Sequence, residues 1–274
     1  MKIQEIEVKS YLTKSKLPES DYVINPYVGC PHGCKYCYAE FMKRFTSHNE
    51  NWGGFLDVKK CDSKINSRIL SGKRVFLSSV TDCYNPFERR YGVTRKILEQ
   101  LIGVDCVINI STKSSLILRD VDLLSKLSKL KVAISLNTLD DYFRRDMDQA
   151  SSIEDRIKTL CELYEKGIYT VLFMSPIFPE ITNWRKIIEK TREFVNEYWF
   201  EELNLRGAYK NRILSYISTN YQEYYKIYKD IYINKERCYW SKLENDILEF
   251  CNKKNIKYKI YFDHKELVKI KNSI

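Results

Sequence analysis

Short apolar runs alternate with amphipathic segments along the chain from about residue 74 onward. Four runs with many β-branched residues predict buried strands at 74–80, 106–112, 132–137 and 168–174. The segments between them repeat apolar positions every three or four residues and predict helices at 94–101, 120–130 and 152–166. This alternation is typical of βα units, which build a parallel sheet with right-handed crossovers.

The pattern extends at both ends of this region. An earlier strand at 22–28 leads into a cluster of cysteines, and a helix at 39–45 leaves it. A helix at 184–199 and a short strand at 202–206 follow the breaks at Pro176 and Pro179. Six strands with intervening helices predict an α/β fold, a partial (β/α)6 TIM-like barrel of parallel strands. Functional residues of such barrels lie at the carboxyl ends of the strands.

Residues 207–274 have a different character. Five tyrosines occur in a Lys-rich helical stretch between 221 and 232, and the pattern of residues 256–263 predicts a β-strand. No linker precedes this mixed helix and strand segment. We therefore expect a C-terminal extension, 207–274, that caps or closes the barrel core formed by residues 1–206.

Composition fits a globular protein, with 44% hydrophobic and 30% charged residues among 274. No run of 18 apolar residues occurs and the N-terminus lacks an apolar core, so we expect a cytoplasmic protein with no membrane contact. Lys and Arg exceed Asp and Glu by 46 to 36, a net charge of +10 that would suit a nucleic acid. A solvated Lys-rich face, as at 253–259 and 265–271, is the commoner meaning.

Nine cysteines, an odd number in a chain of this length, indicate reduced thiols and metal ligation more than a disulfide framework. Cys30, Cys34 and Cys37 place three thiols within eight residues, after a strand and before a helix. A structural zinc site takes four ligands, and the second pair is missing, although His32 could complete it. An iron–sulfur cluster suits this loop better, because three thiolates leave one iron free.

The Cys-x3-Cys-x2-Cys loop, with an aromatic residue before the last cysteine, resembles the radical S-adenosylmethionine (SAM) superfamily. Its setting resembles the spore photolyase-like branch, often called DNA repair photolyase. The matching stretches are collinear over residues 22–206: 25–30, 81–88 with 94–95, 112–120, 135–139 and 176–179.

The resemblance implies two cofactors, a 4Fe-4S cluster on three cysteines and SAM chelated to the fourth iron. One electron, from a donor such as flavodoxin or ferredoxin, then cleaves SAM to a 5′-deoxyadenosyl radical that abstracts a hydrogen atom from substrate. The protein positions these cofactors and excludes water. Some relatives of this type are encoded as adjacent pairs, so a second radical SAM protein is an expected partner.

The resemblance also implies roles for individual residues, each with a plainer alternative. Tyr36 would pack against the SAM adenine or be a core tyrosine. The SAM amino group would meet the segment that includes Ser79, Thr81 and Asp82, although Asp82 could instead cap the following turn. Lys113 would pair with the SAM carboxylate or simply be solvated. Two polar residues of the next strand would bond the ribose or carboxylate, or be satisfied turn residues: Ser135 and Asn137.

The family comparison leaves the substrate open. In spore photolyase, a cysteine just before the position matching Asp82 returns a hydrogen atom to the product, but Ser78, Ser79 and Val80 stand there in this chain. Either Cys83 has taken over as hydrogen donor or the chain performs other radical chemistry, which we favour.

Three functional hypotheses follow from these residues. The leading one is a radical SAM enzyme that acts on an unidentified substrate, for which a nucleic acid is one candidate because of the basic charge and the aromatic C-terminus. A second is modification of a peptide or protein docked on residues 207–274. A third, of another class, is a non-catalytic zinc or iron–sulfur binding protein.

Overall fold

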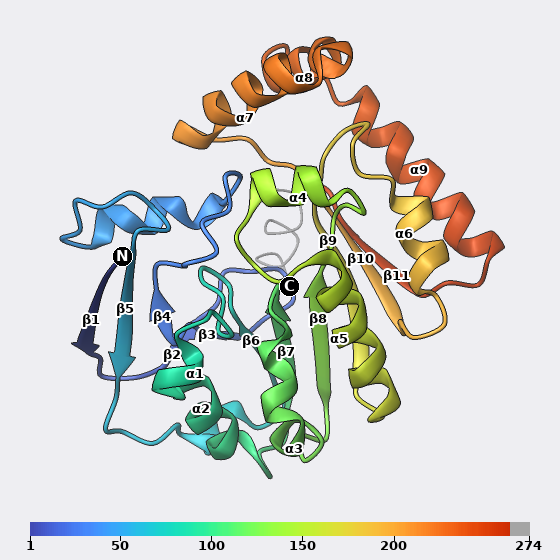
Figure 1. The fold of residues 1–274 in the computed structure, drawn as a ribbon. Coiled ribbons are helices and arrows are strands. Elements are labelled where there is room, and N and C mark those ends of the chain that lie inside the picture. The colour runs from blue at the N-terminus through green and yellow to red at the C-terminus, as the bar shows by residue number, and fades with distance from the viewer. Residues whose placement is uncertain (264–274) are drawn as a thin grey trace.

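The computed structural model describes residues 1–263, and its main element is an eight-stranded sheet in the order β11-β10-β9-β8-β7-β6-β3-β2 (Figure 1). All neighbours pair in parallel except β2 and β3. The strands of this sheet are β2 (Leu12–Lys14), β3 (Tyr22–Ile24), β6 (Lys73–Leu77), β7 (Cys106–Thr112), β8 (Leu130–Ser135), β9 (Tyr169–Ile177), β10 (Glu197–Glu202) and β11 (Tyr258–Tyr261). The sequential order of β3 and β6–β10 confirms the α/β fold and the parallel strands of a partial barrel.

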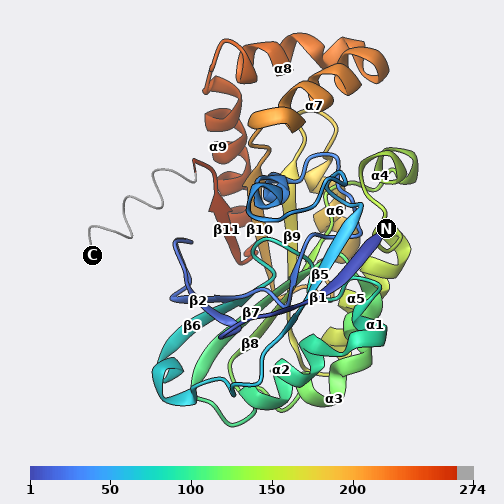
Figure 2. The same cartoon turned by 90° about the vertical axis from the view of Figure 1, so that its left-hand side faces the viewer.

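Helices follow most of the parallel strands, and α2, α3 and α5 lie along one face of the sheet (Figures 1 and 2). The helices are α1 (Glu88–Tyr91), α2 (Val93–Leu101), α3 (Val121–Leu124), α4 (Asp141–Met147), α5 (Ile153–Glu165), α6 (Trp184–Thr191), α7 (Gly207–Asn220), α8 (Tyr225–Tyr232) and α9 (Cys238–Lys253). Helix α5 begins where the Ser152 hydroxyl accepts a hydrogen bond from Asp155 N at 3.0 Å. It ends before Gly167, whose φ of +73° suits a left-handed helix terminus.

The two faces of the sheet differ in polarity, as β7 illustrates. Cys106, Ile108 and Ile110 are buried in the main core on the helical side. Asn109 and Ser111 are half-buried and line a cavity on the other side. Because successive strand residues point to opposite faces, the sequence sends apolar groups to the helices and polar groups to the inside.

One predicted strand is wrong: the last strand of the core is β10 at Glu197–Glu202, and not 202–206. The predicted helix at 184–199 ends early, since α6 stops at Thr191. Phe200 of β10 packs edge-on against Trp184 of α6, with ring centroids 6.2 Å apart. The side chains of Glu197–Glu202 alternate between the core and the cavity, as they do in a strand. Three consecutive aromatic residues conceal this alternation in the sequence.

Two other predicted elements differ in extent. Residues 120–130 form only the short α3, and Leu130 already belongs to β8. The predicted strand 22–28 is split, because β3 joins the main sheet whereas β4 (Tyr27–Val28) pairs with β5 (Phe55–Lys60). A second, three-stranded sheet therefore exists in the order β1-β5-β4, with β1 at Lys2–Glu7. Figure 2 shows β1 and β5 side by side.

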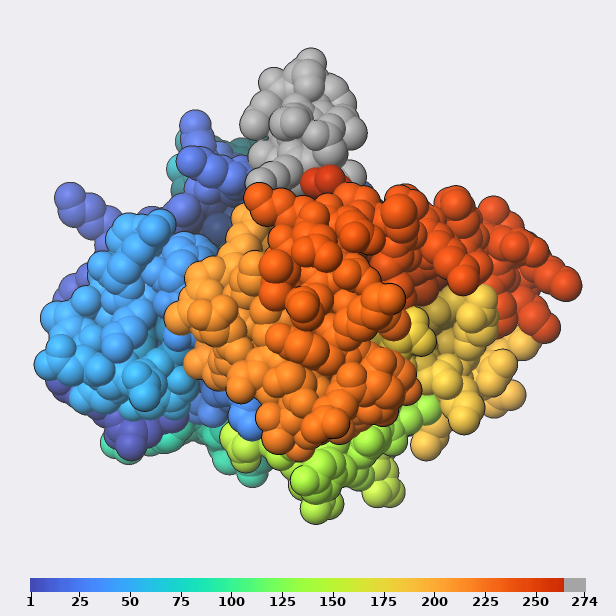
Figure 3. Space-filling view, turned by 90° about the horizontal axis from the view of Figure 1, so that it is seen from above, coloured from blue at the N-terminus to red at the C-terminus, as the bar shows by residue number. Residues whose placement is uncertain are grey.

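The C-terminal segment adds one strand to the main sheet and places helices at one end of the molecule (Figure 1). The predicted strand at 256–263 is confirmed as β11 at Tyr258–Tyr261, and it pairs in parallel with β10. Helices α7 and α8 lie at the end of the molecule that also carries α4, and their orange atoms cover the middle of the face in Figure 3. The division at residue 206 stays a prediction, and the basic stretch 265–271 lies outside the described residues.

Residues 1–263 contain no helix with the length and apolar character that crossing a bilayer requires. The expected cytoplasmic location stays a prediction.

Candidate functional site

Cys30, Cys34 and Cys37 share one loop between β4 and a 3-10 helix at Tyr38–Phe45. Cys30 is buried, and Cys34 and Cys37 are half-buried. The loop turns tightly, with Gly33 N bonded to Cys30 O at 3.2 Å and Cys37 N to Cys34 O at 3.1 Å.

Glycines allow this loop to approach the small sheet. Gly29 has φ of +86°, and a Cβ there would lie 2.4 Å from the Phe55 carbonyl oxygen. Gly53 has φ of +94°, and its added Cβ would lie 2.9 Å from Gly33 Cα. Only glycine meets both demands at these positions.

Hydrogen bonds from three other parts of the chain hold the loop. Thr81 Oγ1 donates to Gly29 O at 2.7 Å. Next to α4, Lys35 N donates to Met147 O at 2.9 Å and Gln149 N donates to His32 O at 2.8 Å. Arg212 of α7 donates to the Lys35 carbonyl at 3.0 Å. The loop geometry is therefore set by the core and the C-terminal segment together.

Asp82 organises the floor of this region through its carboxylate. Oδ1 accepts from Tyr84 N at 2.9 Å and Thr112 Oγ1 at 2.7 Å, and Oδ2 accepts from Lys113 N at 2.9 Å. His32 Nε2 lies 3.2 Å from Oδ2. Burial opposes ionisation, but His32 and these hydrogen bonds outweigh it and lower the pKa of Asp82 to about 2. The carboxylate is thus ionised, and its lone pairs are largely used within the protein.

The cysteine thiols fit an iron–sulfur cluster better than a single metal ion. No three His, Cys, Asp or Glu side chains within residues 1–263 converge as a mononuclear site requires, so the zinc reading has no geometric support. A cluster instead takes each thiolate on a different iron. Burial raises the pKa of all three thiols, so a bound metal would have to drive their deprotonation.

Two buried nitrogen donors near this loop also fit a cluster. His32 Nδ1 and Trp52 Nε1 have no hydrogen-bond partner among the described residues. Buried donors without partners are costly, whereas the sulfurs of a cluster could accept from them.

Tyr36 is held by a buried ion pair that the sequence did not indicate. Its hydroxyl donates to Asp148 Oδ2 at 3.3 Å, and Arg156 Nη2 donates to Asp148 Oδ1 at 2.6 Å. Both side chains of the pair are 1% exposed. The Tyr36 ring packs edge-on against Phe178 at 5.3 Å, and the Lys113 ammonium lies 5.8 Å from its centroid. Tyr36 is thus a core residue that also borders the cavity described next.

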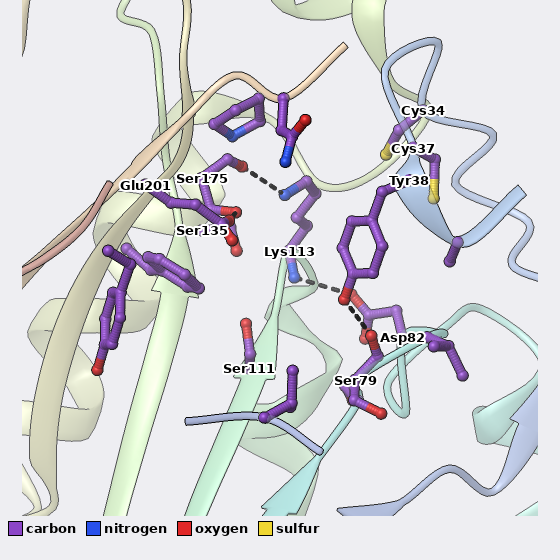
Figure 4. A pocket seen from close by; sticks show the side chains of 18 of the residues that line it. Cys34, Cys37, Tyr38, Ser79, Asp82, Ser111, Lys113, Ser135, Ser175 and Glu201 are labelled. Carbon is purple, nitrogen blue, oxygen red and sulfur yellow. Dashed lines mark hydrogen bonds between the residues drawn. The ribbon is translucent and has the colours of Figure 1, made fainter. Parts of the chain in front are cut away.

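A cavity of about 700 Å³ opens beside the cysteine loop at the carboxyl ends of the parallel strands. Figure 4 shows the Cys34 and Cys37 sulfurs on one side of it and Ser135, Ser175 and Glu201 on the other. Nine residues singled out from the sequence line it: Cys30, Cys34, Tyr36, Cys37, Ser79, Thr81, Asp82, Lys113 and Ser135. Strand order therefore brings together residues more than 100 positions apart.

The polar residues that line the cavity differ in how many hydrogen bonds they already make within the protein. The Ser79 hydroxyl accepts from Asn25 at 2.9 Å, and its carbonyl accepts from the Tyr38 hydroxyl. Lys113 Nζ donates to Ser175 O at 3.4 Å, a long bond that leaves the ammonium able to turn. The Ser135 hydroxyl lies in the cavity wall (Figure 4).

Two of the candidate residues do not line the cavity. Asn137 is buried, and its amide donates to Pro176 O at 3.0 Å, so it holds the β9 terminus. Cys83 is fully buried in the main core, and its backbone N donates to the Ser78 hydroxyl at 2.9 Å. Burial raises the pKa of the Cys83 thiol well above its ordinary value.

The stretches 86–88, 94–95 and 119–120 serve a structural purpose. Glu88 is fully buried and accepts from the Tyr27 hydroxyl, from Thr94 N at 2.9 Å and from Arg119 at 2.7 Å. Asp120 accepts from Arg119 and Arg95, both at 2.8 Å. This network ties β4, α2 and the segment after β7 together behind the cavity.

Sequence comparison supplies a family for these features. The model of the Radical SAM superfamily matches residues 24–194. An uncharacterised protein of Methanocaldococcus jannaschii is 38% identical over 83% of this chain and 86% of its own length. A protein of Pseudomonas phage M6 named Radical SAM Nalpha-GlyT isomerase is 28% identical over 57% of this chain and 33% of its own length.

Solved structures with this fold have low sequence identity to the chain. A spore photoproduct lyase variant with bound AdoMet and dinucleoside spore photoproduct has a TM-score of 0.58 at 15% identity, covering 81% of this chain and 66% of that one. Streptococcus suis SuiB bound to S-adenosylmethionine has a TM-score of 0.56 at 15% identity, covering 87% and 49%. This chain therefore spans just under two thirds of spore photoproduct lyase and about half of SuiB.

Proposed function

Because this chain belongs to the radical SAM superfamily, we propose that Cys30, Cys34 and Cys37 hold its 4Fe-4S cluster and that its substrate is a nucleic acid. Members of this family use the cluster and SAM, and they need a reductant and a substrate. Bound together, the two cofactors supply a 5′-deoxyadenosyl radical that abstracts hydrogen. One observation carries the ligand assignment: the three thiols lie on one pinned loop that borders the 700 Å³ cavity.

The residues around the loop divide into contact and positioning roles. Lys113 and Ser135 lie in the cavity wall, so they are the proposed contacts of the SAM carboxylate and hydroxyl groups. Thr81 and Asp82 hold the loop and the wall through their own hydrogen bonds. Asn137 fixes the end of β9 from outside the cavity. Tyr36 gives an aromatic edge beside Lys113, suited to the adenine.

Cys83 is not the hydrogen donor in this proposal. Its side chain lies in the main core, outside the cavity lining. A thiol must reach the product radical to return a hydrogen atom, and Cys83 would need the core to open. The chain therefore performs radical chemistry with a different final step.

Two kinds of observation support a nucleic-acid substrate. The net charge is +10, which attracts polyanions. The similar spore photoproduct lyase structure contains a dinucleoside ligand. The expected flavodoxin or ferredoxin donor and a second radical SAM partner remain predictions.

The test starts with anaerobic reconstitution with iron and sulfide, followed by dithionite and SAM. We expect 5′-deoxyadenosine from the native chain and none from the Cys30→Ala, Cys34→Ala or Cys37→Ala variants. Cys161→Ala is the matched control, because this half-buried cysteine of α5 lies outside the cavity. Activity in all three loop variants would refute the ligand assignment.

Binding of single-stranded DNA tests the substrate class separately. Contacts with phosphates release counterions, so affinity should fall steeply with salt. Affinity that is unmeasurable at low salt would refute the nucleic-acid proposal while leaving the radical chemistry intact.

A further inference from the structure

The 3-10 helix at Tyr38–Phe45, which follows the cysteine loop, exposes large aromatic side chains; it is the blue helix above the N-terminus in Figure 1. Tyr38, Phe41 and Phe45 are 50%, 44% and 66% exposed. Side chains three residues apart lie above one another on a 3-10 helix, so Tyr38, Phe41 and Arg44 follow one line along its exposed side. Phe45 lies next to the end of this line, with its ring centroid 6.5 Å from that of Phe41. These four residues form the outer row.

A guanidinium lies between the two phenyl rings of the outer row. The Arg44 guanidinium is 5.5 Å from the Phe41 centroid and 4.6 Å from the Phe45 centroid, within the range of a cation–π contact. This contact fixes the charge on the surface without neutralising it. The outer row therefore offers planar rings and a positive charge together.

The charges on this helix leave a positive surface. Its carboxylate, Glu40, accepts a hydrogen bond from Arg212 and is neutralised by it. Lys43 Nζ donates to a neutral acceptor, the Asn49 carbonyl oxygen, at 3.1 Å. Within residues 1–263 no carboxylate forms an ion pair with Lys43 or Arg44. Two cations therefore remain available to an anionic partner.

The outer row begins at the cavity that the cysteine loop borders. Tyr38 lines this cavity although half of it is exposed, and its hydroxyl donates to the Ser79 carbonyl oxygen (Figure 4). Tyr38 therefore lies at the cavity opening. Because a 3-10 helix rises about 2 Å per residue, the row extends about 12 Å from Tyr38 to Arg44. A polymer with one unit in the cavity can pass its neighbouring units along this row.

Rings and cations alternate along the helix, as bases and phosphates alternate along a nucleic-acid strand. Exposed rings stack on bases of any identity, and arginine and lysine bind phosphates. The faces of the bases are covered in a duplex and are available in a single strand. A protein partner would bury the two phenyl rings against apolar side chains, but the guanidinium already occupies the space between them. The outer row thus fits a single strand better than an acidic protein.

We propose that the outer row binds single-stranded nucleotides that flank the one entering the cavity. Bases stack on Phe41 and Phe45, and Arg44 and Lys43 contact the phosphates. This inference rests on the proposed nucleic-acid substrate and adds a binding surface outside the cofactor cavity. Stacking tolerates every base, so the row supplies affinity and not sequence preference.

The first test measures stacking. A fluorescein-labelled thymidine decamer is titrated with reconstituted protein and SAM at low salt, and binding is followed by fluorescence anisotropy. Phe45→Ala should weaken binding roughly 5- to 150-fold, the equivalent of the about 1–3 kcal/mol that a stacking ring contributes. Phe45→Tyr keeps a ring and should retain native affinity. Tyr164→Ala, which removes an exposed ring from α5, is the matched control.

The second test measures the phosphate contact. Arg44→Gln should weaken binding and reduce the slope of log affinity against log salt by about 0.7, the value for one phosphate of a single strand. Lys158→Gln removes an exposed charge from α5 and should change neither quantity. Circular dichroism and bound iron are measured for every variant, and Phe41→Ala tests the row at a second ring.

Two outcomes would overturn the inference. The Phe41, Arg44 and Phe45 variants could bind the decamer as tightly as the native chain does. Alternatively, they could keep this affinity and form less 5′-deoxyadenosine with flavodoxin but not with dithionite, which would assign the row to an electron donor. A native chain that binds no decamer would refute the nucleic-acid substrate itself, whereas native binding with unaffected variants refutes the outer row alone.

Discussion

The buried pair of Arg156 and Asp148 gives the sharpest prediction about stability. Arg156→Met removes the guanidinium that donates to Asp148 at 2.6 Å and leaves the carboxylate 1% exposed. Breaking such a pair from one side costs about 3–5 kcal/mol. The carbonyls of Ser151 and Ser135 also lose a donor at 2.8 and 3.3 Å, so we expect the upper end of that range.

The pH dependence of this loss identifies its cause. Burial raises the pKa of Asp148, but Arg156 and Lys113 outweigh it, so the folded pKa lies below the ordinary value. The pair therefore stabilises the native chain above the unfolded pKa of about 3.9, and this contribution is lost as pH falls through the folded pKa. Without Arg156, burial dominates and disfavours the ionised carboxylate. The difference in unfolding free energy between native and variant chains should grow as pH rises above about 4.

Urea unfolding followed by circular dichroism, at several pH values between 3 and 7, measures this difference. Lys158→Met on the same helix is the control, because its ammonium is 71% exposed and 3.8 Å from Glu162, and we expect less than about 0.5 kcal/mol. Asp148→Asn combined with Arg156→Met should cost less than the sum of the single changes. A loss below about 1 kcal/mol, or one equal at every pH, would refute the reasoning.

Three further predictions concern the cysteine loop and its surroundings. Gly29→Ala should lower both stability and bound iron, because its Cβ meets the Phe55 carbonyl oxygen at 2.4 Å; Gly103→Ala, with φ of +77° and open space, should cost only about 1–2 kcal/mol and retain iron. Thr81→Val should cost about 1 kcal/mol and loosen iron binding measured by chelator competition, whereas Thr81→Ser keeps the bond to the loop. Cys83→Ala should lower the unfolding midpoint without changing 5′-deoxyadenosine formation; loss of product with SAM cleavage intact would restore Cys83 as donor.

The parts of the fold that sequence predicts are those with strong local patterns. Strand β7 has the predicted bounds, since Ile108 and Ile110 alternate with the polar residues Asn109 and Ser111. Helix α5 begins one residue after its predicted start, because Ser152 caps it. These elements are specified by period and capping within a few residues.

The parts that could not be predicted depend on distant partners. Strand β1 has no alternation that separates it from a loop, and it forms only because β5 pairs with it in parallel. The Trp199 segment reads as the end of a helix until β9 and β11 occupy its two edges. Pairing with strands 25 to 60 residues away supplies this information, and local propensity does not contain it.

The candidate site likewise has residues that the sequence predicts and residues that only the fold brings into place. The cysteine triplet is visible because its three members are close in sequence. Arg156 gave no signal, because an arginine in an amphipathic helix is normally solvated, and only the fold buries it against Asp148. Ser175 and Glu201 were missed for a similar reason: their shared wall appears only when β9 and β10 pair.

The two ends of the cavity differ in what a substitution there should change. The cysteine loop is tied to Thr81, to the residues beside α4 and to Arg212, so changes near it disturb several contacts together. Phe173 and Glu201 face the cavity from strands whose opposite faces pack in the main core, so a change in their side chains leaves that core intact. Substitutions on this strand wall could therefore change substrate choice while the cysteine loop stays fixed. This separation gives a physical reason why a chain with the family's cysteine loop need not share a relative's substrate.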